Sequence, residues 1–181
     1  MVGPKGGRSA MSVTRIVSGG QTGADQAGLA VARRLGIPTG GTMPEGFLTE
    51  DGPRPDLARE YSLEQAPSLD YPVRTERNVL VADGTVIFGD MRSPGSMLTA
   101  ELCGRHGRPC LVVTPGAPVA AATQRLRAWL VANRIQTLNV AGNRASQAPG
   151  IAAEVEAVLE AVLSDCRDGI PQPLPRSGLA G

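Results

Sequence analysis

The sequence is poor in aromatic residues and carries almost no net charge. Only 3% of its 181 residues are aromatic although 41% are hydrophobic, so the core has to be built mainly from Val, Leu, Ile and Ala. Buried parallel strands are rich in the same aliphatic residues. A formal net charge of +1 gives no long-range attraction for nucleic acid or for an anionic membrane. We therefore expect no nucleic-acid partner, and an anionic ligand has to be held by local geometry.

Residues that ligate metals are also scarce. Cys103, Cys110 and Cys166 lack close paired spacing and are accompanied by the single histidine His106, so no zinc or iron–sulfur ligand set is predicted. No apolar stretch approaches the roughly 20 residues that cross a bilayer, and no secretory signal follows the N-terminus. These absences predict a cytoplasmic protein with incidental thiols, no membrane association and no metal ligated by protein side chains.

The length suits one domain with a tail at each end. Glycine near the start and proline near the end predict disordered tails at residues 1–12 and 164–181. Residues 13–163 are then a single ligand-binding domain.

Within this domain, short apolar runs alternate with helical patterns. Strands are expected at 13–18, 37–40, 61–63, 85–88, 110–114 and 137–141, and helices at 22–35, 69–82 (entered through Ser68), 96–106, 119–133 and 151–163. Residues 41–59 are expected to be mostly loop. The alternation predicts a mainly parallel sheet with helices on both faces, a Rossmann-like three-layer αβα domain. Ligands of such sheets bind at the edge formed by the carboxyl ends of the strands.

The first loop at that edge is the strongest candidate for a binding site. Its glycines allow close approach of a ligand to the main chain, and the unpaired N–H groups of the helix that follows favour an anion such as phosphate. A tight turn in which Thr22 caps the helix is the structural alternative, and Asp25 could simply complement the helix dipole. The candidate residues are Gly19, Gly20, Gln21, Thr22, Gly23 and Asp25.

Three further loops follow predicted strands. Gly95 and Ser96 open a helix that continues through Thr99 and Glu101, which makes either a second anion site or a capped helix with a solvated glutamate. Asn143, Arg144 and Ser146 follow the last strand, where Arg144 could pair with phosphate or belong to a polar surface loop. The segment around Gly41, continuing to Pro53, is long for a connection between a strand and a helix, and is either a binding loop or a structural Ω-type loop.

No established catalytic set is present. His106 lies near a predicted helix end, and no Cys–His or Ser–His–Asp arrangement follows from the sequence. We expect Asp25, Asp83 and Glu101 to converge at the ligand edge, which leaves acid–base chemistry open.

Several ordered motifs together resemble the putative molybdenum carrier family over about residues 13 to 163. They are Ser18-Gly19-Gly20-Gln21-Thr22-Gly23-Ala24-Asp25, Gly40-Gly41 with Pro44, Gly46 and Glu50-Asp51-Gly52-Pro53, Asn78-Val79, Asp83-Gly84-Thr85-Val86-Ile87-Phe88, Leu98-Thr99 and Asn139-Val140-Ala141-Gly142.

The resemblance implies a Rossmann-like fold related to the lonely-guy phosphoribohydrolases, and binding of the molybdenum cofactor, a pterin that holds its own metal and carries a phosphate. It also implies homo-oligomers, dimers or tetramers, and partners among molybdoenzymes or cofactor-biosynthesis proteins. By position, Gly19 to Thr22 and Gly95 to Thr99 would face the ligand, and Gly41, Asp83, Asn143 and Arg144 complete the predicted set.

Two departures from the related patterns stand out. Pro94-Gly95-Ser96 replaces the usual Gly-Gly-Ser, and Glu101 falls one residue short of the phosphoribohydrolase glutamate, whose place Leu102 takes. The resemblance therefore favours a non-catalytic carrier. The alternatives are a nucleoside monophosphate N-glycosidase that uses Asp25 or Glu101, and a nucleotide-sensing module.

Overall fold

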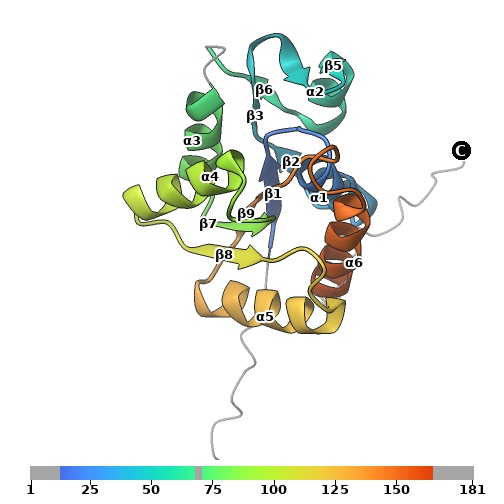
Figure 1. Cartoon of the computed structure of the whole chain (residues 1–181), viewed down its shortest axis with the longest axis vertical. Helices are drawn as coiled ribbons and strands as arrows, with labels where there is room; N and C mark the ends of the chain where they lie inside the picture. The colour runs from blue at the N-terminus through green and yellow to red at the C-terminus, as the bar shows by residue number, and fades with distance from the viewer. Residues whose placement is uncertain (1–12, 68–70, 165–181) are drawn as a thin grey trace, which may run out of the picture.

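The computed structural model describes residues 13–67 and 71–164 (Figure 1). The predicted tail 1–12, nearly all of the predicted tail 164–181, and the predicted helix cap Ser68 lie outside the described residues.

A five-stranded sheet forms the centre of the domain, and all of its strands are parallel. The last strand in the sequence lies in the middle, between the first strand and the strand that follows the third helix. In spatial order the strands are β2 (Thr39–Gly40), β1 (Arg15–Ser18), β9 (Thr137–Gly142), β7 (Gly84–Phe88) and β8 (Cys110–Val113).

Two layers of helices cover the sheet. On one face, α1 (Ala24–Arg34) and α5 (Val119–Ala132) both pack against α6 (Ile151–Leu163), and on the other α3 (Tyr71–Val81) packs against α4 (Pro94–Arg105). Figure 1 shows these two groups on opposite sides of the strands. The predicted three-layer α/β fold with its parallel sheet is confirmed.

The two faces of the sheet differ in chemistry. Ile16, Leu138 and Val140 belong to the large aliphatic core shared with α1, α5 and α6. Because side chains alternate along a strand, Asn139 and its register partner Thr85 point to the other face, toward α3 and α4. Both polar side chains are buried, so the sheet presents one aliphatic face and one partly polar face.

The start of α4 lies two residues before the predicted start at Ser96. Pro94 occupies the first helical position, where its missing N–H costs no hydrogen bond. The Ser93 hydroxyl accepts a hydrogen bond from the Ser96 N–H at 3.3 Å, which caps the helix.

The segment between β2 and α3 is more structured than predicted. It contains β3 (Thr42–Met43), the 3-10 helix η1 (Glu45–Phe47), β4 (Leu48–Thr49), β5 (Gly52–Pro53), α2 (Pro55–Tyr61) and β6 (Glu64–Gln65). The predicted loop at 41–59 and strand at 61–63 are therefore wrong. Leu57, Tyr61 and Leu63 form a small core with Leu29 of α1 and Met43, and this packing stabilises a helix too short to show a clear periodicity.

Gly41 holds this segment against the sheet. Its φ of 127° is rarely adopted by residues with a side chain, and a β-carbon there would overlap the carbonyl oxygen of Ser18. We predict that Gly41→Ala lowers the free energy of unfolding by about 3 kcal/mol or more, since backbone strain and steric overlap add.

Gly36→Ala is the matched control for this substitution. Gly36 also has a positive φ, 69°, but a β-carbon there meets nothing within 4 Å, so its cost is about 1–2 kcal/mol of strain alone. Urea denaturation measures both variants, and equal losses of stability would contradict the assigned role of Gly41.

Candidate functional site

A polar pocket lies where β1, β9 and β7 end at the carboxyl edge of the sheet. It contains about 390 Å³ of empty space, its open mouth included. Loops that are distant in sequence meet here because the strands are parallel. The lining residues are Gly19, Gln21, Asp25, Arg74, Thr75, Asn78, Gly95, Thr99, Asn139, Ala141 and Gly142. The loop at Gly19 and the start of α4 at Gly95, separate candidates in the sequence, thus line one pocket.

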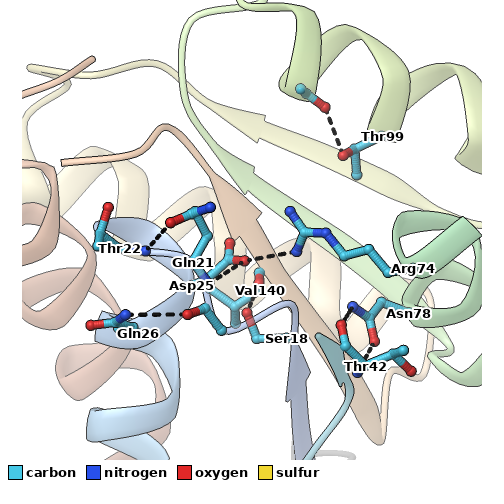
Figure 2. A network of polar contacts seen from close by, with 12 residues as sticks. Ser18, Gln21, Thr22, Asp25, Gln26, Thr42, Arg74, Asn78, Thr99 and Val140 are labelled. Atoms are coloured by element: carbon cyan, nitrogen blue, oxygen red, sulfur yellow. Dashed lines mark hydrogen bonds and ion pairs between the residues drawn. The ribbon is translucent and has the colours of Figure 1, made fainter. Parts of the chain in front are cut away.

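A buried ion pair crosses this pocket. Arg74 of α3 extends toward α1, and its Nη1 lies 3.5 Å from Oδ2 of Asp25 (Figure 2). The two side chains are only 5% and 7% exposed. The guanidinium passes over Gly19, where a β-carbon would overlap it. A side chain at position 19 would therefore displace the guanidinium from its place beside Asp25.

Burial raises the pKa of the Asp25 carboxyl, while Arg74 and the backbone N–H groups of Gln21 and Gly19 act in the opposite direction. The Gln21 N–H donates to Asp25 Oδ2 at 3.3 Å. The Asp25 carboxyl at the beginning of α1 is thus bonded by groups of the chain itself.

Two more main-chain amides of the first loop bond within the protein. The Thr22 N–H donates to Oε1 of Gln21 at 3.1 Å, and the Ala24 N–H donates to the carbonyl of Asn143 at 3.2 Å. The sequence predicted that this loop directs unpaired amides at a phosphate. In the structure the three amides that bond within the protein, those of Gln21, Thr22 and Ala24, donate to Asp25, Gln21 and Asn143. Fewer main-chain amides of the loop are therefore available to an external anion.

The buried side of α3 contributes a second polar group. Asn78 is 3% exposed; its Oδ1 accepts from the Thr42 N–H at 2.7 Å, and its Nδ2 donates to the Thr42 carbonyl at 3.0 Å. Figure 2 shows this pair beside Arg74. Asn78 therefore ties α3 to β3 and fixes the helix that carries Arg74.

A larger hollow adjoins the pocket. It has about 680 Å³ of empty space and is lined by Ser93, Pro94, Gly95, Leu98, Gly142, Arg144 and Gln147. Gly95 and Gly142 line both spaces. The two hollows therefore meet at Gly95 and Gly142, and Arg144 lines the larger one.

Glu50 holds the surrounding loops together from the turn between β4 and β5. Its carboxylate accepts hydrogen bonds from the hydroxyls of Thr22 and Ser146, and its own N–H donates to Gln21 Oε1 at 2.8 Å. Hydrogen bonds from Ser146 and Thr22 lower the pKa of this carboxyl. The β4–β5 hairpin thus fastens the first loop to the loop after β9.

The other predicted site residues have mainly structural contacts. Gly20 and Gly23 adopt positive φ in the first loop. The Ser96 hydroxyl bonds to the Ser93 hydroxyl, and the Thr99 hydroxyl donates to the Gly95 carbonyl at 2.8 Å. Asn143 Oδ1 accepts from the Asp90 N–H at 2.7 Å.

The expected convergence of three carboxylates at the ligand edge is wrong. Asp83 precedes β7, and its Oδ2 accepts from the N–H groups of Gln136 and Thr137 at the start of β9, so it lies at the opposite edge of the sheet. Glu101 is exposed and pairs with Arg105. Only Asp25 of the three lines the pocket. His106 ends α4 and bonds to Glu76.

Six lining residues were not predicted as site residues, although some belong to the quoted motifs: Arg74, Thr75, Asn78, Asn139, Ala141 and Gly142. The first three share the buried side of α3, which a search for apolar periodicity passes over because the side is polar. Asn139 interrupts an apolar strand, and an amide between Leu138 and Val140 was the available signal.

We predict that the Asp25–Arg74 pair shows strong energetic coupling. Arg74→Met and Asp25→Asn each break the buried pair and should lower the free energy of unfolding by about 3–5 kcal/mol. The double variant should lose about 1–3 kcal/mol less than the sum of the single losses. Urea denaturation of all four proteins measures this, and additive losses would show that the two groups do not interact.

The pH dependence gives a further check on the same variants. Because the folded-state pKa of Asp25 is raised above its ordinary value of 3.8, its contribution to stability falls as pH rises above 3.8. Removing the Arg74 charge should raise that pKa further, so in Arg74→Met the fall should extend to higher pH than in the unmodified protein. The double variant lacks the Asp25 carboxyl and should not show this fall.

Glu50 should titrate in the opposite sense. Its pKa lies below the ordinary value of 4.5, so its hydrogen bonds persist above pH 4.5 and are lost as pH falls through the lowered value. The Ser146 amide, which donates to Glu50, should report a midpoint below 4.5 by NMR, and Glu50→Gln should abolish that titration. A midpoint at or above 4.5 would refute the assignment.

Two properties of the described part of the chain bear on ligand chemistry and location. Across residues 13–67 and 71–164, no three His, Cys, Asp or Glu side chains are grouped so that they could hold a metal ion. No helix in those ranges has the length and apolarity needed to cross a membrane.

Comparison with known proteins agrees with this architecture. Residues 16–163 match the circularly permutated YpsA SLOG family. The structure is similar to the crystal structure of a putative molybdenum carrier protein from Syntrophus aciditrophicus, with 40% sequence identity, a TM-score of 0.78, and coverage of 84% of this chain and 96% of that one. No curated protein matches the chain. With its parallel sheet, its glycine-lined pocket and a match over most of its length, the chain belongs to the circularly permutated YpsA SLOG family, in its molybdenum carrier-like branch.

Proposed function

We propose that this protein binds the molybdenum cofactor, a phosphate-bearing pterin, and carries it without catalysing a reaction. The observation that carries the proposal is the polar pocket and its adjoining hollow, in a chain 40% identical to a protein named as a molybdenum carrier. In the cell, we expect a cytoplasmic homo-oligomer that exchanges the cofactor with molybdoenzymes or with cofactor-biosynthesis proteins.

The polarity of the two hollows suits this ligand. Small-molecule sites contain a few convergent polar groups, and such groups line both the pocket and the hollow. The pterin would lie among Gln21, Asp25 and Asn139. The phosphate would extend past Gly95 toward Arg144, whose guanidinium suits bidentate contacts with phosphate.

A carrier role requires no general acid or base, and the pocket fits that requirement. Asp25, the carboxylate that lines it, is engaged by Arg74. Glu101, the second candidate acid for a nucleotide hydrolase, pairs with Arg105 on the exposed side of α4. The geometry therefore favours binding over N-glycosidic cleavage.

Retention of the cofactor tests the proposal. The protein is incubated anaerobically with cofactor released from a molybdoenzyme and passed through a desalting column, and both molybdenum and oxidised pterin are measured in the protein fraction. We expect co-elution of the two in a fixed ratio. A folded protein that retains neither would overturn the proposal.

Arg144→Gln should weaken retention about tenfold, the equivalent of one charge-assisted hydrogen bond to the phosphate. Arg134→Gln is the matched control, because Arg134 is exposed and lies between α5 and β9, at the other edge of the sheet. Equal effects of the two substitutions would show that Arg144 acts only through net charge.

A further inference from the structure

Asn139 carries a hydrogen-bond acceptor that the protein itself does not use. The residue is 2% exposed and lines the pocket. Its Nδ2 donates to Thr85 Oγ1 at 3.2 Å, whereas its buried Oδ1 has no hydrogen-bond partner among the described residues. An unpaired buried acceptor is destabilising, so a ligand that supplies an N–H donor recovers the lost hydrogen bond.

The orientation of the Asn139 amide is given by its contact with Thr85. Because its nitrogen donates to the Thr85 hydroxyl, its oxygen is left for the pocket.

Three other polar side chains line the same pocket, and each acts as a hydrogen-bond donor or as an acceptor. Asp25 offers a carboxylate. The Gln21 oxygen accepts from the Thr22 and Glu50 amides, so its Nε2 group is turned the other way, toward Arg74 (Figure 2). The Arg74 guanidinium is itself a donor. The pocket thus combines two acceptors, Asp25 and Asn139, with two donors, Gln21 and Arg74.

We propose that this pocket recognises the 2-amino-4-oxopyrimidine ring of a fused heterocycle such as pterin or guanine, with Asn139 as the residue that reads its amino group. The exocyclic amino group and the neighbouring ring N–H donate to Asn139 Oδ1 and Asp25. The exocyclic oxygen accepts from Gln21 or Arg74. This inference rests on the proposed function, because it names the part of the ligand held in the same pocket.

Adenine offers a poorer match. Its amino group neighbours a ring acceptor instead of a ring N–H, so one acceptor of the pocket would face a lone pair. Sites built to bond a polar group reject analogues that lack it, since their own buried groups are then left unpaired.

Analogue binding to the unmodified protein tests the inference. Dissociation constants are measured by calorimetry for pterin against lumazine, which has an oxygen in place of the amino group, and for guanosine against inosine, xanthosine and adenosine monophosphates. We expect pterin and guanosine monophosphate to bind about tenfold or more tightly than their amino-free analogues and than adenosine monophosphate. The difference between the pterin and guanine arms identifies which heterocycle the site prefers.

Two substitutions assign the effect to Asn139. Asn139→Leu removes the acceptor and should reduce the preference for the amino group to about twofold or less. Asn139→Asp retains acceptor oxygens and should keep the preference. Thermal denaturation shows whether each variant is folded, and the comparison of analogues on the unmodified protein remains decisive if one of them is not.

The outcomes separate this inference from the proposed function. Cofactor retention with equal binding of pterin and lumazine, and of guanosine and inosine monophosphates, would overturn the inference alone. Amino-group discrimination without cofactor retention would support the inference and overturn the carrier role. Absence of binding by every compound together with absence of retention would overturn both.

Discussion

The ion pair between Asp25 and Arg74 is the interaction on which the geometry of the site depends. It links the beginning of α1 to α3, two elements separated in sequence by the whole β3–β6 segment. A buried ion pair is a weak source of net stability, because desolvation offsets much of the Coulomb attraction. Its effect here is positional: it fixes both polar side chains at the carboxyl edge of the sheet, and the guanidinium fills the space that a β-carbon at position 19 would need.

This arrangement distinguishes the first loop from glycine-rich loops that receive phosphate on the main-chain amides of a helix start. Three such amides bond to Asp25, Gln21 and Asn143. At the second helix start, Ser93 accepts hydrogen bonds from the N–H groups of Ser96 and Met97. Both helix starts are therefore largely satisfied from within, and side chains rather than amides define the chemistry of the pocket.

The sequence was sufficient to predict the layered fold. Aliphatic runs such as Thr85–Phe88 and Cys110–Thr114 alternate with helices, and this pattern leaves few architectures open. It was insufficient for α2, because one short helix is stabilised by contacts to Leu29 and Met43 that local sequence does not reveal. Asp83 was misplaced for a different reason: it precedes a strand, and the residues before parallel strands gather at the edge opposite the ligand.

About half of the residues that line the pocket could be predicted from the sequence. Gly19, Gln21, Asp25, Gly95 and Thr99 were identified because loops that follow strands meet at one edge. Arg74, Thr75 and Asn78 were missed because burial of a polar helix side depends on tertiary partners. Asn78 bonds to the backbone of Thr42, and Arg74 pairs with Asp25, and neither partner is adjacent in sequence.

The place of β9 in the middle of the sheet has a consequence for how the chain reaches its native state. During synthesis β1 and β7 emerge well before β9, so their facing edges have no strand between them until residues 137–142 leave the ribosome. Unpaired strand edges invite pairing with other chains, and contacts between distant segments form slowly. Since Asn139 lies on that same strand, the lining of the pocket is complete only after β9 has closed the sheet.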